Sequence, residues 1–369
     1  MKKALFMLIF ISLIVCSGIK ISAQVNLSAQ SCIVIDGESG RVLFEKNAYE
    51  TRPMASTTKI MTALVVLEKL ELNEMVEVSA SAAGTEGSSI WLSPGENMSV
   101  EDLLYALMLA SGNDAAAALA EYTSGSEAAF ALLMNQKAKS IGAYNTNFTN
   151  PHGLPDDNHY TTAYDLALIS AYAMKNSTFA QIVATENKTI SWEGSQWKRS
   201  LKNHNKLLSR YEYATGVKTG YTKKAGRCLV SCAEKDGRRN ICVTLNAPDD
   251  WNDHITLHEY CFENYKAEIV CKKGQSAGVF LNNDVEYDDV NLLYGDDFIT
   301  SVKEGETVSV KKFFNVKYPV SKNQIVGRLD IYRNSEHIGS VSLVSGNDAI
   351  EKETITKVLL ELVKGIMKP

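Results

Sequence analysis

Segments with strand character stand on both sides of a long helical stretch, and this arrangement limits the possible folds more than any other feature of the chain. Residues 32–36 and 41–45 predict one hairpin, and residues 229–233 and 241–245 predict another around an Asp-Gly turn. Apolar residues at helical spacing predict helices near residues 58–70, 103–109, 115–122, 126–141, 163–174 and 254–265. Strands this far apart, with helices inserted between them, favour an α/β (α+β) domain in which a mixed sheet is flanked by helices and joined to a helical subdomain.

The chain is long enough for about two domains, and its character changes near residue 272. It has 369 residues, and a domain takes roughly 150. Beyond the Lys-Lys-Gly-Gln-Ser-Ala-Gly run at residues 272–278, short alternating segments at 307–310, 325–332 and 338–344 predict a small all-β domain. We therefore expect a main domain at residues 24–271, a β-sandwich at residues 272–348 and a terminal amphipathic helix at residues 349–369.

The first 23 residues have the layout of an export signal. Lys2 and Lys3 precede an apolar run at residues 4–15, and Ala23 supplies a small residue at a cleavage position. An uncleaved anchor is the alternative. A lipoprotein signal that uses Cys16 is disfavoured, because the preceding Val15 is larger than that processing usually accepts. The prediction is an exported protein whose signal peptide is removed.

The last residues form an apolar stripe at helical spacing. Its members are Ile355, Val358, Leu359, Leu362, Val363, Ile366 and Met367. Charged residues interrupt the segment too often for it to span a bilayer, but such a helix can lie flat in a membrane surface. The alternatives are a helix docked on its own protein and a helix that pairs with another chain. We expect peripheral attachment to the outer face of the cytoplasmic membrane.

Composition and cysteine usage narrow the class of protein further. The net charge is −5, which gives no overall electrostatic reason to bind nucleic acid. Six cysteines remain outside the signal, and their spacing matches neither a stapled scaffold nor a zinc motif. Cys228 and Cys232 are about 13 Å apart along one strand and cannot bond to each other. We expect buried thiols, while a bond from either residue to Cys242 stays open.

Three short motifs carry the chemistry: Ser56-Thr-Thr-Lys59, Ser111-Gly-Asn113 and Lys218-Thr-Gly220. A serine hydroxyl is a weak nucleophile until a base takes its proton. At i and i+3 near the start of a helix, Ser56 and Lys59 share one face. A lysine amine acts as a base only when burial or a nearby cation lowers its pKa, and Lys218 is the candidate cation.

The remaining motif residues have complementary roles. Ser111 can relay a proton to a leaving amine, because a hydroxyl both donates and accepts hydrogen bonds. Asn113 can orient the lysine and a substrate amide. Gly220 removes a side chain where a substrate backbone must approach a strand. The backbone N–H groups of Ser56 and Tyr221 would form an oxyanion hole.

Together these stretches resemble the serine-type D-alanyl-D-alanine carboxypeptidases, the low-molecular-weight penicillin-binding proteins. The three motifs appear in order. Further similar stretches lie at residues 53–62, 110–115, 150–154, 159–163, 203–208, 216–222 and 225–226, so the resemblance covers roughly residues 30–270. It implies a transpeptidase-like domain followed by a β-sandwich. It also implies removal of the terminal D-alanine from peptidoglycan stem peptides through an acyl-enzyme on Ser56, with β-lactams as inhibitors and no cofactor.

One departure concerns recognition of the substrate carboxylate. Many relatives have a Gly-Gly-Arg segment where this chain has Asn-Ala-Pro-Asp-Asp-Trp at residues 246–251. Lys218, Thr219 and Thr222 would then bind the carboxylate. Arg227 is near in sequence, with an orientation that the sequence leaves open.

Two rival functions lead to different expectations. A class A β-lactamase needs a glutamate that activates water between the second and third motifs, and Glu186, Glu193 and Glu212 lack that family's sequence setting. A β-lactam should therefore acylate Ser56 and leave slowly. A non-catalytic peptidoglycan-binding protein of the same fold is disfavoured, because all motif residues are present.

Other chemistry-bearing residues lie outside the motifs. His254 and His258 are four apart on a predicted helix beside Glu259, a spacing seen in zinc sites, but no third ligand is evident and we expect ordinary surface histidines and no metal. Trp192 and Trp197 fit either a sugar platform or simple packing.

Overall fold

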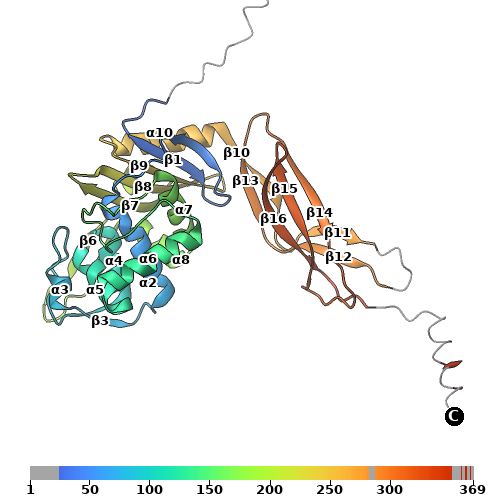
Figure 1. Cartoon of the computed structure of the whole chain (residues 1–369), viewed down its shortest axis with the longest axis horizontal. Coiled ribbons are helices and arrows are strands. Elements are labelled where there is room, and N and C mark those ends of the chain that lie inside the picture. Colours follow the sequence, from blue (N-terminus) through green and yellow to red (C-terminus); the bar gives the residue numbers. More distant parts are fainter. Residues whose placement is uncertain (1–24, 282–286, 351–358, 360–361, 364–365, 367–369) are drawn as a thin grey trace, which may run out of the picture.

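The computed structural model describes residues 25–281, 287–350, 359, 362–363 and 366. They form a larger body of helices and sheet and a smaller, elongated β domain, as Figure 1 shows. The expected export signal lies outside the described residues.

A five-stranded sheet is the frame of the larger body. Its strands follow the order β2-β1-β9-β8-β7, and they are β1 (Ser31–Asp36), β2 (Val42–Lys46), β7 (Ala214–Thr222), β8 (Gly226–Lys235) and β9 (Arg238–Leu245). Both predicted hairpins are present, and β1 pairs directly with β9, so the two ends of this body meet. Every pairing is antiparallel. The expected mixed sheet is therefore wrong, because a chain that returns through helices can re-enter the sheet in either direction, and the sequence pattern does not show which.

Helices cover both faces of this sheet (Figure 1). One face packs against α10 (Asp250–Asn264) and the other against the helical subdomain. That subdomain contains α2 (Lys59–Lys69), α4 (Val100–Leu109), α5 (Asn113–Ser124), α6 (Glu127–Ile141), α7 (Ala163–Ala173) and α8 (Ser177–Ala184). Ser99 caps α4, since its Oγ accepts the Asp102 N–H at 3.1 Å.

Short elements complete the larger body and border the helical subdomain. They are the 3₁₀ turn η1 (Ala55–Thr58), the helices α3 (Ala80–Ala83) and α9 (Leu207–Arg210), and the two-stranded sheets β3 (Met75–Glu77) with β4 (Asn97–Ser99) and β5 (Asn187–Ile190) with β6 (Arg199–Lys202).

The interface between α10 and the sheet corrects the expectation for the two histidines. His254 and His258 are completely buried. The Ser231 hydroxyl lies 2.6 Å from His254 Nδ1 and 2.7 Å from His258 Nε2, and Thr244 Oγ1 lies 2.9 Å from His254 Nε2. Helical spacing alone cannot show which face is covered, and here both imidazoles face the sheet.

The six cysteines of the described chain are all free and buried. Cys228 and Cys232 belong to the core on the helical-subdomain side of the sheet, whereas Cys242 belongs to the core on the α10 side. Residues on opposite faces of one sheet cannot form a disulfide, so the bond to Cys242 left open above is excluded.

The smaller domain is all β, as predicted. A five-stranded sheet has the order β11-β12-β16-β15-β14, and β10 pairs with β13 in a second sheet. The strands are β10 (Tyr265–Cys271), β11 (Ser276–Phe280), β12 (Val290–Tyr294), β13 (Phe298–Lys303), β14 (Val308–Phe314), β15 (Ile325–Arg333) and β16 (Glu336–Ser345). The β domain begins one strand before the expected boundary after residue 271, because β10 is hydrogen-bonded to β13.

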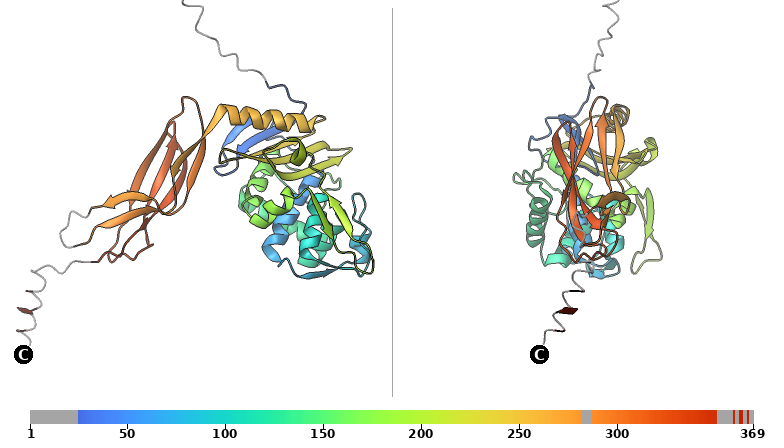
Figure 2. Two further views of the ribbon diagram at one scale, coloured as in Figure 1. Left: turned by 180° about the vertical axis from the view of Figure 1, so that it is seen from behind. Right: turned by 90° about the vertical axis from the view of Figure 1, so that its right-hand side faces the viewer.

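Polar contacts join the two bodies where the β1–β2 turn meets β13, a junction that the views in Figure 2 also show. Asp36 accepts a hydrogen bond from Ser301, and Arg41 forms two hydrogen bonds with the Glu306 carboxylate at 2.7 and 2.6 Å. The Arg41 guanidinium also lies 4.9 Å from the ring centroid of Tyr265, at the start of β10. These contacts hold the β domain against the sheet of the larger body.

The chain beyond Ile350 is described only in part. The expected helix at residues 349–369 lies mostly outside the described residues, and within it Leu359, Leu362, Val363 and Ile366 are exposed. In the part of the chain that the structure describes, no helix combines the length and apolarity needed to cross a bilayer.

We expect Arg41→Met to loosen the junction between the two bodies. The pair is mostly buried, so its loss should lower the free energy of unfolding by about 2 kcal/mol, between the values for exposed and buried ion pairs. Chemical denaturation measures this change, and limited proteolysis should show faster cleavage near β10. Lys224→Met is the control, because both partners of its ion pair with Asp157 are exposed. Equal stability of the two variants would contradict a role for the junction.

Candidate active site

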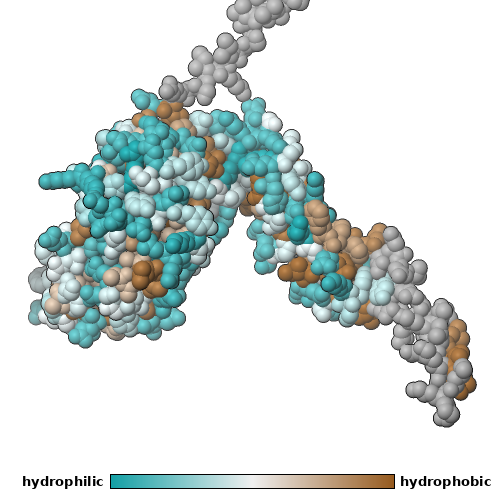
Figure 3. All heavy atoms as spheres, viewed as in Figure 1, coloured by the Kyte–Doolittle hydropathy of each residue, from teal (hydrophilic) through white to brown (hydrophobic). Residues whose placement is uncertain are grey.

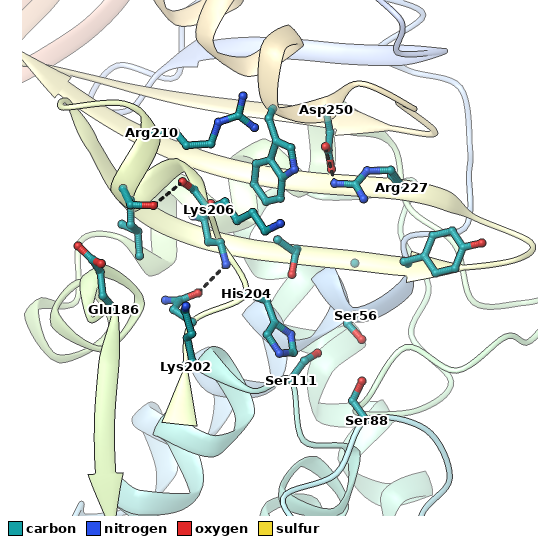
Figure 4. Close-up of a pocket in the computed structure, with 18 of the residues that line it drawn as sticks. Ser56, Ser88, Ser111, Glu186, Lys202, His204, Lys206, Arg210, Arg227 and Asp250 are labelled. Atoms are coloured by element: carbon teal, nitrogen blue, oxygen red, sulfur yellow. Dashed lines mark hydrogen bonds and ion pairs between the residues drawn. The ribbon is translucent and has the colours of Figure 1, made fainter. Parts of the chain in front are cut away.

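Ser56 occupies the 3₁₀ turn η1, directly before α2. The turn begins at Ala55, whose φ of +49° lies in the left-handed region that non-glycine residues rarely adopt. Ser56 is half-buried and lines a cleft of about 790 Å³ (Figure 4). The 3₁₀ turn therefore presents the Ser56 hydroxyl to the cleft, and the helix α2 that follows it runs into the core.

Lys59 lies one helical turn beyond Ser56 and is completely buried. Its Nζ is 3.0 Å from Ser56 Oγ, 2.7 Å from Asn113 Oδ1 and 2.7 Å from the His152 carbonyl oxygen. A neutral amine has two N–H donors and one lone pair. It can donate to the two oxygens that only accept and receive the proton of the serine hydroxyl. These contacts therefore suit a general base.

Burial and a neighbouring cation favour the neutral form of this amine. Burial is the main cause that lowers the pKa of Lys59 well below its ordinary value, and Lys218 lowers it further, while Asp114 opposes the shift. Burial also lowers the pKa of Lys218 to about 7. A base whose pKa lies near the working pH is the most effective. The predicted roles of Lys59 as base and Lys218 as nearby cation thus have a geometric basis.

The second motif places Ser111 and Asn113 beside Ser56 and Lys59. Ser111 lines the cleft together with Ser56, and its φ of +62° is again in the left-handed region. Asn113 begins α5, accepts from Lys59, and donates through Nδ2 to the Glu86 carbonyl at 2.6 Å. Its amide group is therefore fixed on both sides.

The third motif lies on the edge strand β7. Thr219, Gly220 and Tyr221 line the cleft, and the Lys218 side chain is buried beneath it. A Cβ atom on Gly220 would lie 3.0 Å from the Ser56 backbone nitrogen, so only glycine lets the strand approach this closely.

Thr222, the fifth predicted substrate-binding residue, is placed differently. Thr219, Gly220 and Tyr221 are among the lining residues of the cleft, whereas Thr222 is absent from them. Its Oγ1 accepts the Ala225 N–H at 3.0 Å and so closes the turn between β7 and β8. Thr222 is the last residue of β7, and its contact with a substrate stays a prediction.

Arg227 lies across the strand pair from Tyr221 and lines the cleft. Its Nη2 is 2.7 Å from Asp250 Oδ1, and its guanidinium lies 5.5 Å from the ring centroid of Trp251 (Figure 4). The orientation that the sequence left open is thus toward the cleft. The Asp250–Trp251 pair that replaces the family's Gly-Gly-Arg segment holds this arginine in place.

Several lining residues could not be found from motifs. Ser88, His204, Lys206 and Arg210 border the cleft in Figure 4. Burial, followed by the charges of Lys218 and Lys59, lowers the pKa of His204, so the imidazole is neutral at pH 7. Residues 203–208 belong to the stretches that resemble the family, but no spacing rule marks them as part of a site.

The two acidic residues that line the cleft do not supply a water-activating glutamate beside Ser56. Glu186 lies at the end of the cleft away from Ser56 (Figure 4), and Asp250 is paired with Arg227. This arrangement differs from that of a class A β-lactamase.

Cys242, His254 and His258 form the one group in the described chain whose donor atoms could surround a metal ion, all within 4.8 Å of one another. Hydroxyl groups of Ser231 and Thr244 already contact three of the four ring nitrogens. Burial lowers the pKa of His258 to about 3, so its ring is neutral. The two histidines are thus hydrogen-bonded parts of the core, although His258 Nδ1 is buried without a partner.

Comparisons with known proteins agree with this geometry. Residues 19–249 match the D-alanyl-D-alanine carboxypeptidase family model, and residues 265–351 match the penicillin-binding protein 5 C-terminal domain. D-alanyl-D-alanine carboxypeptidase DacF of Bacillus subtilis is 33% identical over 350 residues, which cover 91% of this chain and 90% of that protein. The D-alanyl-D-alanine carboxypeptidase of Streptomyces sp. is 39% identical over 256 residues, 64% of this chain and 88% of that protein.

Solved structures give the same result. Penicillin-binding protein 5 from Haemophilus influenzae has a TM-score of 0.73 and 28% identity, with 89% of this chain and 99% of that chain covered. The match includes both the larger body and the β domain. The chain belongs to the D-alanyl-D-alanine carboxypeptidase family, the serine enzymes of the low-molecular-weight penicillin-binding type.

Proposed function

We propose that this enzyme releases the terminal D-alanine of peptidoglycan stem peptides through an acyl-enzyme on Ser56. The observation that carries the assignment is the contact of Lys59 Nζ with both Ser56 Oγ and Asn113 Oδ1 at the edge of the cleft. Among the described lining residues, Ser56 is the hydroxyl in contact with a buried amine.

The first half-reaction forms the ester. Lys59 takes the Ser56 proton as Oγ attacks the carbonyl carbon of the scissile amide. The backbone N–H groups of Ser56 and Tyr221 receive the oxyanion, because Gly220 brings β7 against the Ser56 nitrogen. Ser111 gives its hydroxyl proton to the leaving amine and takes one from the Lys59 ammonium, so D-alanine departs and Lys59 is neutral again.

The second half-reaction releases the shortened peptide. Water attacks the ester carbon, Lys59 accepts its proton, and Ser56 regains its hydroxyl hydrogen. Thr219 and Arg227 both line the cleft, and we assign them to the carboxylate of the departing D-alanine. A β-lactam forms the same ester on Ser56, and its release is slow because the cleft supplies no glutamate beside the ester.

Ser56→Ala should abolish both D-alanine release from a pentapeptide and covalent labelling by a fluorescent penicillin, because no other lining hydroxyl contacts a buried amine. Released D-alanine and gel fluorescence measure the two outcomes. Ser140→Ala, an exposed serine on α6, is the control and should behave as the parent enzyme. Labelling that persists in Ser56→Ala would refute the assignment of the nucleophile.

The pH dependence of acylation tests the base. Acylation needs neutral Lys59, so its rate should rise with pH until this amine has lost its proton. Lys218→Met removes a cation that lowers the pKa of Lys59, and the acid limb should move to higher pH by about one unit. Stopped-flow acylation across pH measures the limb. Lys206→Met removes a cleft cation that does not perturb Lys59 and should leave the midpoint unchanged. An unmoved midpoint in Lys218→Met would contradict the coupling.

For localisation, we infer an exported enzyme held at the outer face of the cytoplasmic membrane by its C-terminal segment. The four described residues of that segment are apolar and exposed. Apolar side chains also gather on the end of the β domain from which this segment leaves (Figure 3), where Val279, Leu281, Phe313, Phe314 and Ile325 are exposed. Such a surface supports reversible attachment by apolar burial.

A chain ending after Ile350 should lose liposome binding and keep its carboxypeptidase activity, since the cleft lies in the other body. Ile350 is the appropriate end, because Ala349 is buried and its backbone pairs with Val320. Co-sedimentation of the full-length and shortened proteins with liposomes measures the difference. Equal sedimentation of both proteins would instead favour a docking or oligomerisation helix.

A further inference from the structure

Three of the four tryptophans lie in two segments outside the catalytic cleft. Trp91 and Trp197 are exposed to 79% and 78%, and Trp192 to 37%. Trp91 follows the cleft residue Ser88, whereas Trp192 and Trp197 lie in the turn between β5 and β6. Single exposed apolar residues are common. Less common are the contacts that Arg199 makes here, with the backbone of Trp91 and the ring of Trp192.

A buried arginine joins the two segments. Arg199, at the start of β6, donates through Nε to the Ile90 carbonyl and through Nη2 to the Trp91 carbonyl, both at 2.9 Å. It also forms a two-pronged ion pair with Glu96, and its guanidinium lies 4.6 Å from the ring centroid of Trp192. Buried ion pairs contribute little net stability, so their effect here is to fix one geometry.

The backbone around Trp91 is held from a second side. Asp114, the neighbour of Asn113, accepts from Ser89 Oγ at 2.6 Å and from the Ile90 and Leu92 N–H groups at 3.0 and 3.2 Å. Between these anchors Trp91 has a φ of +63°, a strained value for an aromatic residue. Strain of this kind persists only where surrounding contacts impose it and often marks a functional position.

Trp91 forms one wall of a shallow groove. The groove measures about 490 Å³, and its polar lining includes Thr85, Glu86, Ser89 and Ser93. None of its lining residues is basic, which disfavours an anionic ligand. An indole face beside hydroxyl and carboxylate groups suits a neutral sugar ring, which has an apolar face of C–H groups and a rim of hydroxyls.

The groove and the catalytic cleft share a wall. Asn113 donates from its backbone N–H to the Ser88 carbonyl at 2.7 Å and from Nδ2 to the Glu86 carbonyl at 2.6 Å. Ser88 lines the cleft, whereas Glu86, Gly87 and Ser89 line the groove. The two cavities are thus lined by consecutive residues of one loop.

We propose that the Trp91 groove is a saccharide subsite, which binds the glycan that carries the stem peptide. This inference rests on the proposed function, because the peptide in the cleft defines where its sugar lies. Trp192, whose ring packs on Arg199, and Trp197 in the same turn extend the aromatic surface along a longer glycan strand. The groove thus adds binding energy to a peptide that is still attached to its sugar.

The test compares two substrates on full-length protein: a free pentapeptide and the same pentapeptide attached to its disaccharide. Trp91→Ala should raise KM for the sugar-bearing substrate about tenfold, the size expected for one aromatic contact, with kcat kept. On the free pentapeptide it should change kcat/KM less than twofold. Trp91→Phe should restore most of the loss, and Tyr144→Ala, an equally exposed aromatic outside both cavities, should have no effect.

Direct binding gives an independent readout. Peptide-free glycan fragments of peptidoglycan should quench the tryptophan fluorescence of Ser56→Ala protein, and Trp91→Ala should remove that quenching. Equal losses on both substrates, or no loss on either, would overturn the saccharide subsite. Inactivity of the parent enzyme on free pentapeptide would instead refute the proposed function, and glycan quenching would then still decide the subsite.

Discussion

The burial of one lysine is the constraint on which the rest of the site depends. An ammonium group without water is costly, and Lys59 is completely buried with Lys218 close enough to lower its pKa further. The cost favours the neutral amine, which two accepting oxygens and one hydroxyl surround. The same arrangement that makes the lysine tolerable in the core also makes it a base.

Maintaining that environment requires parts of the chain that are distant in sequence. Ser56 and Lys59 come from the start of α2, Asn113 from α5, and His152 from the segment before α7. The antiparallel sheet brings β7 against the turn that holds Ser56, and Gly220 allows the closest approach. Asn113 and Asp114 then extend the network outward to the loop that carries Trp91. The cleft and the groove are therefore organised by one helix terminus.

The sequence predicts the catalytic residues well because their chemistry is local. A hydroxyl, an amine at helical spacing and a glycine on a strand can be recognised within four residues, and the structure brings Ser56, Lys59, Asn113 and Gly220 together. The all-β second domain could be predicted for the same reason, since alternation is a local pattern.

What could not be predicted depends on pairing between distant segments. Strand direction, the position of β10 in the second domain and the buried orientation of His254 and His258 follow from register and packing. Thr222 ends β7 and accepts the Ala225 N–H, a turn contact that the motif does not predict. Arg227 becomes part of the cleft only because Asp250 and Trp251 face it from another element.

The buried thiols have a consequence for the chemistry of the whole chain. Burial raises the pKa of Cys32 and Cys232 to about 12 and that of Cys228 to about 11, so these groups stay protonated in the native protein. Thiol reagents and peroxides react with the thiolate, and a protonated thiol inside a core is inert to both. These three thiols are therefore protected from oxidants and alkylating reagents while the core stays closed. They become reactive only when the core opens, so the rate of their alkylation reports the rate of opening.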